Sequence, residues 1–340
     1  MDLLGVRPSL FAILALLAFL CLSACPIHAK IEGDDKPLIV ITISPLYLIA
    51  KEIIGNNTEI YVLAPAGVDP HLYSPTPEHA MKVASCNLFI CVGKEEFLGQ
   101  LQGHIEELRA RGGLIINWDS WIKEGVHVED DNPHYLWLYP PNAKIIAKVV
   151  AKAMSLLDPN NRDYYFLRAN IFEGKINELE EWRDSVMENF KEVRVLLAGD
   201  HFEPFVKWLG LSISSIIIKG EGGLPGPQKI KEAVNAARTS KLIVVSALQV
   251  EGYEGAYASQ VSAESGIPIA CLYGVPLSMS DTYVEFIKYN SMILTSHLTH
   301  DQPISRLAMP LMSEVYIALI ILLASIAVIE GIIILRLRLR

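Results

Sequence analysis

The chain has 340 residues, and 29 lysines and arginines stand against 38 aspartates and glutamates, which gives a net charge of −9 at pH 7. This acidic balance argues against nucleic acid as a partner, because a phosphate backbone selects clustered positive charge. Once the two apolar ends are set aside, roughly 275 residues remain, a length that favours two lobes over one.

The first 30 residues have the pattern of an export signal. Arg7 precedes the apolar run Leu10–Leu22, small residues follow, and polar sequence resumes at Lys30. The stretch Leu22-Ser-Ala-Cys25 also resembles the bacterial lipobox, in which the cysteine is lipidated. Plain cleavage and an uncleaved anchor are the alternatives to lipidation of Cys25.

Short apolar runs alternate with longer amphipathic segments through the middle of the chain. A helix is expected from Pro45 to Ile54, closed by Gly55, and a long helical segment over 141–193. The runs expected to be strands are Leu38–Ile43, Glu59–Leu63, Leu88–Val92, Gly113–Asn117, Val193–Leu197, Ser212–Ile218, Leu242–Ser246 and Pro268–Leu272. This alternation predicts an α/β fold: two lobes with mainly parallel sheets, joined by a long rigid helix, with a cleft between the lobes.

The far end of the chain has the composition of a transmembrane helix. Val315–Leu335 is apolar apart from Glu330, and the basic tail that follows predicts a cytoplasmic end. The predicted domains are therefore a signal segment (1–30), an N-terminal lobe (31–140), a linking helical segment (141–193), a C-terminal lobe (194–296), a linker (297–314) and a transmembrane helix (315–335). The lobes are expected on the extracytoplasmic face of the cell membrane.

Three loops after predicted strands contain a histidine, at His71, His134 and His201. Ligands of open parallel sheets bind beyond the carboxyl ends of the strands, and imidazole is the commonest metal ligand in proteins. Prolines flank all three histidines and stiffen their loops. These loops are the candidate binding site.

Two of the loops resemble a known family. The stretch from Gly67 to Pro77 reads G-V-D-P-H-L-Y-S-P-T-P, and residues 133–138 read P-H-Y-L-W-L. Both are similar to motifs of the zinc- and manganese-binding proteins of ABC importers. The resemblance implies two α/β lobes that bind one divalent ion in the cleft, with zinc favoured and manganese or another first-row metal possible. It also implies an ABC permease and its ATPase as partners at the membrane.

The resemblance assigns His71 and His134 as metal ligands. The family's third and fourth ligand positions fall on Gly199 and Val275, whose side chains cannot bind metal. Asp200, His201 or Glu203 could replace the third ligand, and His201 is favoured by its donor type. Asp200 is instead expected to cap the helix that begins near Phe202.

Two other functions compete with metal import. With its second-lobe ligands altered, the chain could bind another solute or act as a tethered adhesion module. Histidines and an acid could also hold a hydrolytic zinc ion. However, the sequence contains no H-E-x-x-H, G-x-S-x-G or P-loop motif. An enzyme is therefore not predicted.

Overall fold

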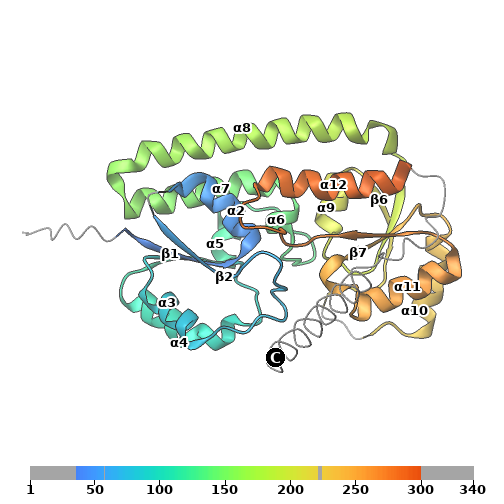
Figure 1. The fold of residues 1–340 in the computed structure, drawn as a ribbon, viewed down its shortest axis with the longest axis horizontal. Coiled ribbons are helices and arrows are strands. Elements are labelled where there is room, and N and C mark those ends of the chain that lie inside the picture. The colour runs from blue at the N-terminus through green and yellow to red at the C-terminus, as the bar shows by residue number, and fades with distance from the viewer. Residues whose placement is uncertain (1–35, 57, 221–223, 300–340) are drawn as a thin grey trace, which may run out of the picture. The chain divides into compact units, whose positions relative to one another are not determined.

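Two four-stranded parallel sheets organise the residues that the computed structural model describes, 36–56, 58–220 and 224–299 (Figure 1). The N-terminal sheet has the order β2-β1-β3-β4, formed by β1 (Leu38–Ile43), β2 (Glu59–Ala64), β3 (Leu88–Ile90) and β4 (Leu114–Ile116). The C-terminal sheet repeats it as β6-β5-β7-β8, formed by β5 (Arg194–Leu197), β6 (Ser212–Ile216), β7 (Ile243–Ser246) and β8 (Ile269–Leu272). Each of the eight predicted runs holds one of these strands.

Helices connect and cover the strands of each sheet. The N-terminal lobe contains α2 (Ser44–Ile54), α3 (Pro77–Ser85), α4 (Leu98–Ala110), α5 (Trp118–Lys123), α6 (Tyr135–Leu138) and α7 (Pro140–Leu157). The C-terminal lobe contains α9 (Glu203–Trp208), α10 (Pro227–Ala237) and α11 (Tyr253–Ser265), and α12 (Tyr283–Thr299) follows its last strand. Between them lies α8 (Arg162–Met187), and single 3-10 turns occur at 159–161, 188–190 and 247–249.

Local sequence explains where the first elements begin and end. Every residue of β1 after Leu38 is buried, as expected for a parallel strand that is covered on both faces. Helix α2 has a proline in its first turn and ends at Gly55, which has a φ of 73° and donates its N–H to the Lys51 carbonyl. A side chain at Gly55 would collide with the Tyr164 hydroxyl of α8, so this turn requires glycine.

The predicted helical segment over 141–193 contains two helices, α7 and α8. Helix α7 packs on α2 and α8, and the chain breaks at Asp158 and Pro159 before α8 begins. The Asp158 carboxylate accepts hydrogen bonds from the Asn161 side chain and the Tyr165 hydroxyl, at 2.7 and 2.9 Å. At 1.5 Å per residue, the 26 residues of α8 extend about 39 Å. Figure 1 shows α8 running past both lobes.

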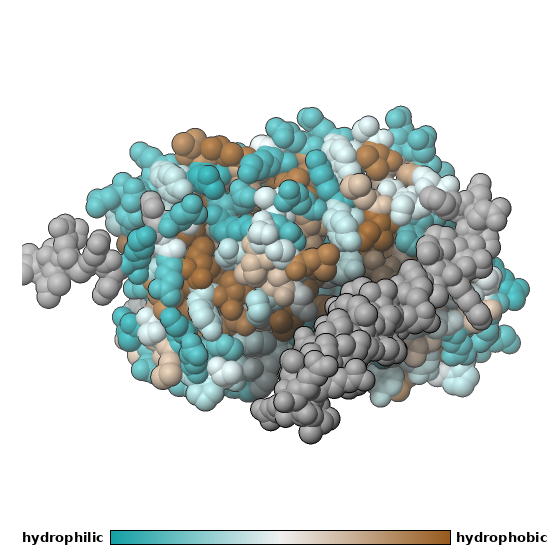
Figure 2. Space-filling model, viewed as in Figure 1, coloured by the Kyte–Doolittle hydropathy of each residue, from teal (hydrophilic) through white to brown (hydrophobic). Residues whose placement is uncertain are grey.

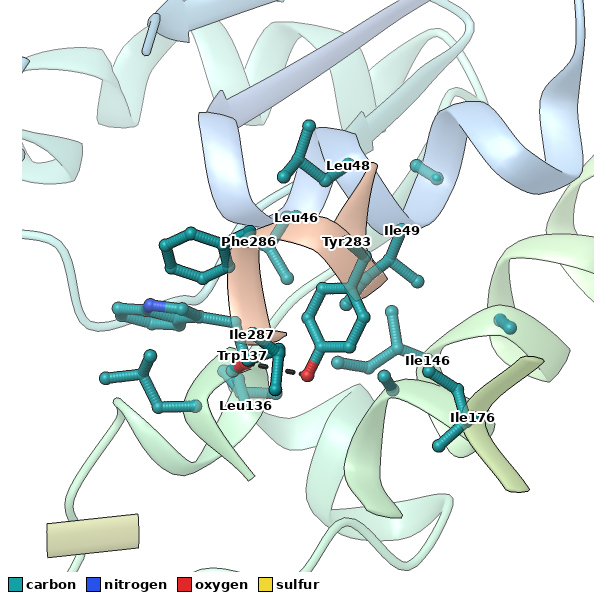
Figure 3. Packing of buried hydrophobic residues seen from close by; sticks show 14 of the residues in the cluster. Leu46, Leu48, Ile49, Leu136, Trp137, Ile146, Ile176, Tyr283, Phe286 and Ile287 are labelled. Atoms are coloured by element: carbon teal, nitrogen blue, oxygen red, sulfur yellow. Dashed lines mark hydrogen bonds between the residues drawn. The ribbon is translucent and has the colours of Figure 1, made fainter. Parts of the chain in front are cut away.

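The last described helix returns to the N-terminal lobe. Tyr283, at the start of α12, is fully buried among apolar side chains from α2, α7 and α8, as Figure 3 shows. Its hydroxyl donates a 2.8 Å hydrogen bond to the Trp137 carbonyl in α6. One continuous apolar core therefore joins the two lobes.

The predicted fold class is wrong in one part. Among the described residues, no helix is both long and apolar enough to cross a bilayer, so the transmembrane helix does not belong to the architecture that they define. The predicted segments 1–30 and 315–335 lie outside the described residues. On the face seen in Figure 2, the described surface mixes hydrophilic residues with separate hydrophobic patches.

Candidate metal centre

His71 lies in the loop between β2 and α3. Its backbone N–H donates to Oδ1 of Asp69 at 2.9 Å, a short-range turn that sets the direction of the loop. The other carboxylate oxygen of Asp69 accepts a 2.8 Å hydrogen bond from Gln249, which follows β7 in the second lobe. The His71 loop is therefore tied to both lobes, while the His71 side chain itself is exposed.

His134 is buried, and Asn132 sets the orientation of its ring. Oδ1 of Asn132 accepts the backbone N–H of His134 at 3.0 Å and lies 2.8 Å from its Nδ1. Because Oδ1 is the acceptor in the first bond, Nδ1 must be the donor in the second, which leaves Nε2 with a free lone pair. Burial, followed by the neighbouring His201 and His71, holds the pKa of His134 well below its ordinary value. The ring is thus neutral, the form that binds metal.

His201 lies in the turn between β5 and α9 and comes from the second lobe. Its Nδ1 lies 2.9 Å from Oε1 of Glu254, although the pair is not aligned as a good hydrogen bond. Burial by itself lowers the pKa of His201, but the combined attraction of Glu254, Asp200 and Asp69 raises it above its ordinary value. His201 therefore differs from His134 in carrying a proton more readily.

The three histidines converge in one cluster. One ring nitrogen from each of His71, His134 and His201 lies within 4.8 Å of the other two. The ring centroids of His134 and His201 are 4.5 Å apart, and that of His71 is 5.9 and 5.5 Å from them. In a tetrahedral zinc site, with Zn–N near 2.1 Å, the nitrogens are about 3.4 Å apart. Small side-chain rotations would bring these nitrogens to that spacing.

Asp200 and Glu203 lie outside this cluster. Oδ2 of Asp200 accepts the Gly220 N–H at 2.6 Å, so the expectation that Asp200 caps α9 is wrong: the N-cap residue is Phe202, and no side chain caps that helix. Glu203 is buried as the first residue of α9, and its Oε1 lies 2.8 Å from Nζ of Lys207, one turn later. The Asp200 carboxylate and Oε1 of Glu203 therefore have other partners, whereas Oε2 of Glu203 is buried without a hydrogen-bond partner among the described residues.

Two residues that bear on the site carry no obvious sequence signal. In the family that the sequence resembles, the second histidine motif has the form D-P-H-x-W-L, and Asn132 occupies the position of its aspartate. Its Nδ2 donates to the Asp200 carbonyl at 2.9 Å, a bond that an aspartate could not make. Glu254, in α11, is far from every histidine motif in the sequence. The departure from D-P-H could have pointed to Asn132, whereas only the fold brings Glu254 to His201.

Three acidic residues just before His134, at positions 129–131, each form an ion pair with a lysine. Glu129 lies 2.5 Å from Lys207 and Asp130 lies 2.6 Å from Lys219, both lysines being in the second lobe. The neighbouring Asp131 pairs with Lys94 of its own lobe. Asp130 and Asp131 have φ values of 50° and 60°, an uncommon conformation for side chains larger than glycine. Two of these three ion pairs connect the turn that leads to His134 with the second lobe.

The chain is similar to known substrate-binding proteins of metal ABC transporters. The metal ABC transporter substrate-binding lipoprotein FimA of Streptococcus parasanguinis is 28% identical over 79% of this chain and 91% of FimA. The manganese ABC transporter substrate-binding lipoprotein PsaA of Streptococcus mitis is also 28% identical, over 81% of this chain and 93% of PsaA. The iron ABC transporter substrate-binding lipoprotein MtsA of Streptococcus pyogenes is 25% identical, covering 78% and 88%.

Solved structures share the fold. A Mn-bound periplasmic metal-binding protein from Candidatus Liberibacter asiaticus matches with a TM-score of 0.62 at 22% identity, covering 77% of this chain and all of that one. FpvC of Pseudomonas aeruginosa in complex with Ni²⁺ matches with a TM-score of 0.64 at 20% identity, covering 77% and 96%. Residues 39–296 match the family described as ZnuA, zinc-uptake complex component A, periplasmic, and the chain belongs to that family.

Proposed function

We propose that the protein is the substrate-binding subunit of a metal ABC importer, which captures one divalent transition-metal ion between its lobes and delivers it to a permease driven by an ATPase. The observation that carries the proposal is the convergence of His71 and His134 from one lobe with His201 from the other. An ion bound to all three would link the lobes, so that the loaded protein differs from the empty one in a way that a permease can recognise.

The donor atoms favour zinc over manganese. Imidazole nitrogen suits zinc, copper, iron and nickel, whereas carboxylate and carbonyl oxygen suit manganese. Within the described residues, the clustered donors are three imidazoles, without a carboxylate in the same group. Zinc, which accepts four-coordinate N and O sites, is therefore the proposed cargo.

The leader supports attachment to the extracytoplasmic face of the membrane. The relatives FimA, PsaA and MtsA are named lipoproteins, and Cys25 ends a lipobox-like stretch. We therefore place the lobes outside the cell, held by a lipid on Cys25.

Metal analysis tests the proposal directly. Purified full-length protein is exposed to equimolar Zn²⁺, Mn²⁺, Fe²⁺, Co²⁺ and Ni²⁺ under reducing, anaerobic conditions, separated from free metal and analysed. We expect one ion per chain with zinc in excess over manganese, and a zinc-dependent rise in Tm, because a ligand that binds only the folded state stabilises it. The control replaces His71, His134 and His201 by alanine together. Metal retained equally by this control, or manganese preferred over zinc, would contradict the assignment.

A further inference from the structure

A buried carboxylate stands behind His201. Glu254 lies in the first turn of α11, and its side chain is only 10% exposed. Its Oε1 lies 2.9 Å from Nδ1 of His201, and its Oε2 is buried with no hydrogen-bond partner among the described residues. Burying an ionised carboxylate costs several kcal/mol unless it is paired, and the group that faces this carboxylate is the ring of His201.

The absence of a side chain at Gly199 gives Glu254 its place. A Cβ built on Gly199 would overlap Oε1 of Glu254 and would lie only 2.8 Å from its Oε2. Residue 199 is also where the motif resemblance places a metal-binding side chain. In this chain the carboxylate reaches that space from α11 instead, and it meets the ring of His201 two residues further along the loop.

We propose that Glu254 is a positioning residue for the metal site. It holds His201 through Nδ1, directs Nε2 towards His71 and His134, and supplies negative charge that three neutral imidazoles lack. Histidines that bind metal almost always donate their other ring N–H to a carboxylate, carbonyl or water. The inference rests on the proposed function, since it assigns a residue to the same site.

The geometry assigns Glu254 to the histidine rather than to the ion. The donor atoms that lie within 4.8 Å of one another are those of His71, His134 and His201, and Glu254 is outside this group. The 2.9 Å approach to Nδ1 fixes which ring nitrogen faces the carboxylate. The other ring nitrogen is then the one available to metal.

Zinc affinities of single and double variants at Glu254 and Gly199 test the positioning role of Glu254. Glu254→Ala is expected to weaken Zn²⁺ binding by about 10–100-fold, and Glu254→Gln by less, because an amide oxygen then takes the place of Oε1 beside Nδ1. Gly199→Ala should weaken binding similarly by displacing the carboxylate, and should add no further loss in a Glu254→Ala background. Glu251→Ala, at an exposed residue just before α11, is the matched control.

Three results would overturn the role. The first is a Glu254→Ala variant that binds zinc as tightly as the parent. The second is a Gly199→Ala substitution that lowers zinc affinity by the same factor in the parent and in the Glu254→Ala background. The third is a changed visible spectrum of bound Co²⁺ in Glu254→Gln, because positioning leaves the set of atoms bound to the metal unchanged.

A measurement without metal separates this inference from the proposed function. Long-range ¹⁵N NMR of His201, at a pH where its ring is neutral, should show the Nδ1–H tautomer in the parent and loss of that preference in Glu254→Ala. A parent protein that fails to bind zinc contradicts the proposed function alone, whereas the same tautomer in both proteins contradicts the positioning role. Tm values of the metal-free variants show whether each one is folded.

Discussion

Asn132 holds His134 and the opposite lobe with one amide group. Its Oδ1 receives both the backbone N–H and Nδ1 of His134, while its Nδ2 donates to the Asp200 carbonyl, one residue before His201. A single side chain thereby sets the tautomer of one candidate ligand and the position of the loop that carries another.

Asn132→Ala is expected to weaken zinc binding by about 10–100-fold, the range typical for groups that orient metal ligands. Asn132→Asp keeps an acceptor for His134 but loses the donor to Asp200, so it should fall between the parent and Asn132→Ala. Isothermal titration calorimetry measures both variants. Unchanged affinity in Asn132→Ala would show that His134 is oriented by its other contacts.

His201→Ala should weaken zinc binding by at least about tenfold, or about 1.4 kcal/mol, because the second lobe then offers no histidine to the cluster. His71→Ala and His134→Ala are expected to lose at least as much. His104→Ala, on the surface of α4, is the control, since among the described residues the ion-pair partner of His104 is Glu107 of its own helix. If His201→Ala binds like the parent while Asp200→Ala or Glu203→Ala abolishes binding, the ligand assignment in this loop is wrong.

Asp200→Ala is expected to lower the free energy of unfolding by about 1 kcal/mol, because the Gly220 N–H loses its acceptor. Asp200→Asn retains an acceptor oxygen and should lose less. Zinc affinity should change little in either variant, because the Asp200 carboxylate is occupied elsewhere. Denaturant unfolding and calorimetry separate the two effects. A loss of zinc binding without a loss of stability would return Asp200 to the list of ligands.

The ion pairs of Lys207 with Glu129 and of Lys219 with Asp130 connect the two lobes. Removing each lysine should lower the free energy of unfolding by a different amount. Lys207→Met leaves Glu203 buried without its cation and should cost about 1–3 kcal/mol, less than for a fully buried pair because the Lys207 side chain is a third exposed. Lys219→Met breaks an ion pair in which both side chains are more than half exposed and screened by water, so the loss of stability should be the smaller of the two. Equal losses in urea unfolding would contradict this ranking.

Zinc affinity should fall on acidification, because a proton and a metal ion compete for the same ring nitrogen. The raised pKa of His201 means that this competition begins at a higher pH than for an ordinary imidazole. Because the pKa of His134 is lowered, protons compete with metal at His134 only at a lower pH. Below the pKa of His201, affinity should weaken about tenfold per pH unit for each proton displaced. Zinc titrations over a series of buffers measure the slope, and a flat profile across the acid range would exclude histidine ligands.

All eight strands could be located from the sequence to within a few residues, because a strand buried on both faces of a parallel sheet must be apolar along its length, and that pattern is local. It also placed His71, His134 and His201 in loops after strands, where the shared edge of a parallel sheet brings side chains together. The break at Asp158 and Pro159 is local too, because a proline ends the preceding helix.

The partners of the polar groups in the site depend on the tertiary structure. From the sequence, the Asp200 carboxylate could cap α9 or bind metal. In the structure it accepts the N–H of Gly220, which lies in the loop after β6. Glu254 reaches His201 only because α11 packs against the second sheet and Gly199 leaves room for a carboxylate. Hydrophobic periodicity is encoded within a few residues, whereas the partner of a buried charge depends on how separate segments pack, which no local pattern specifies.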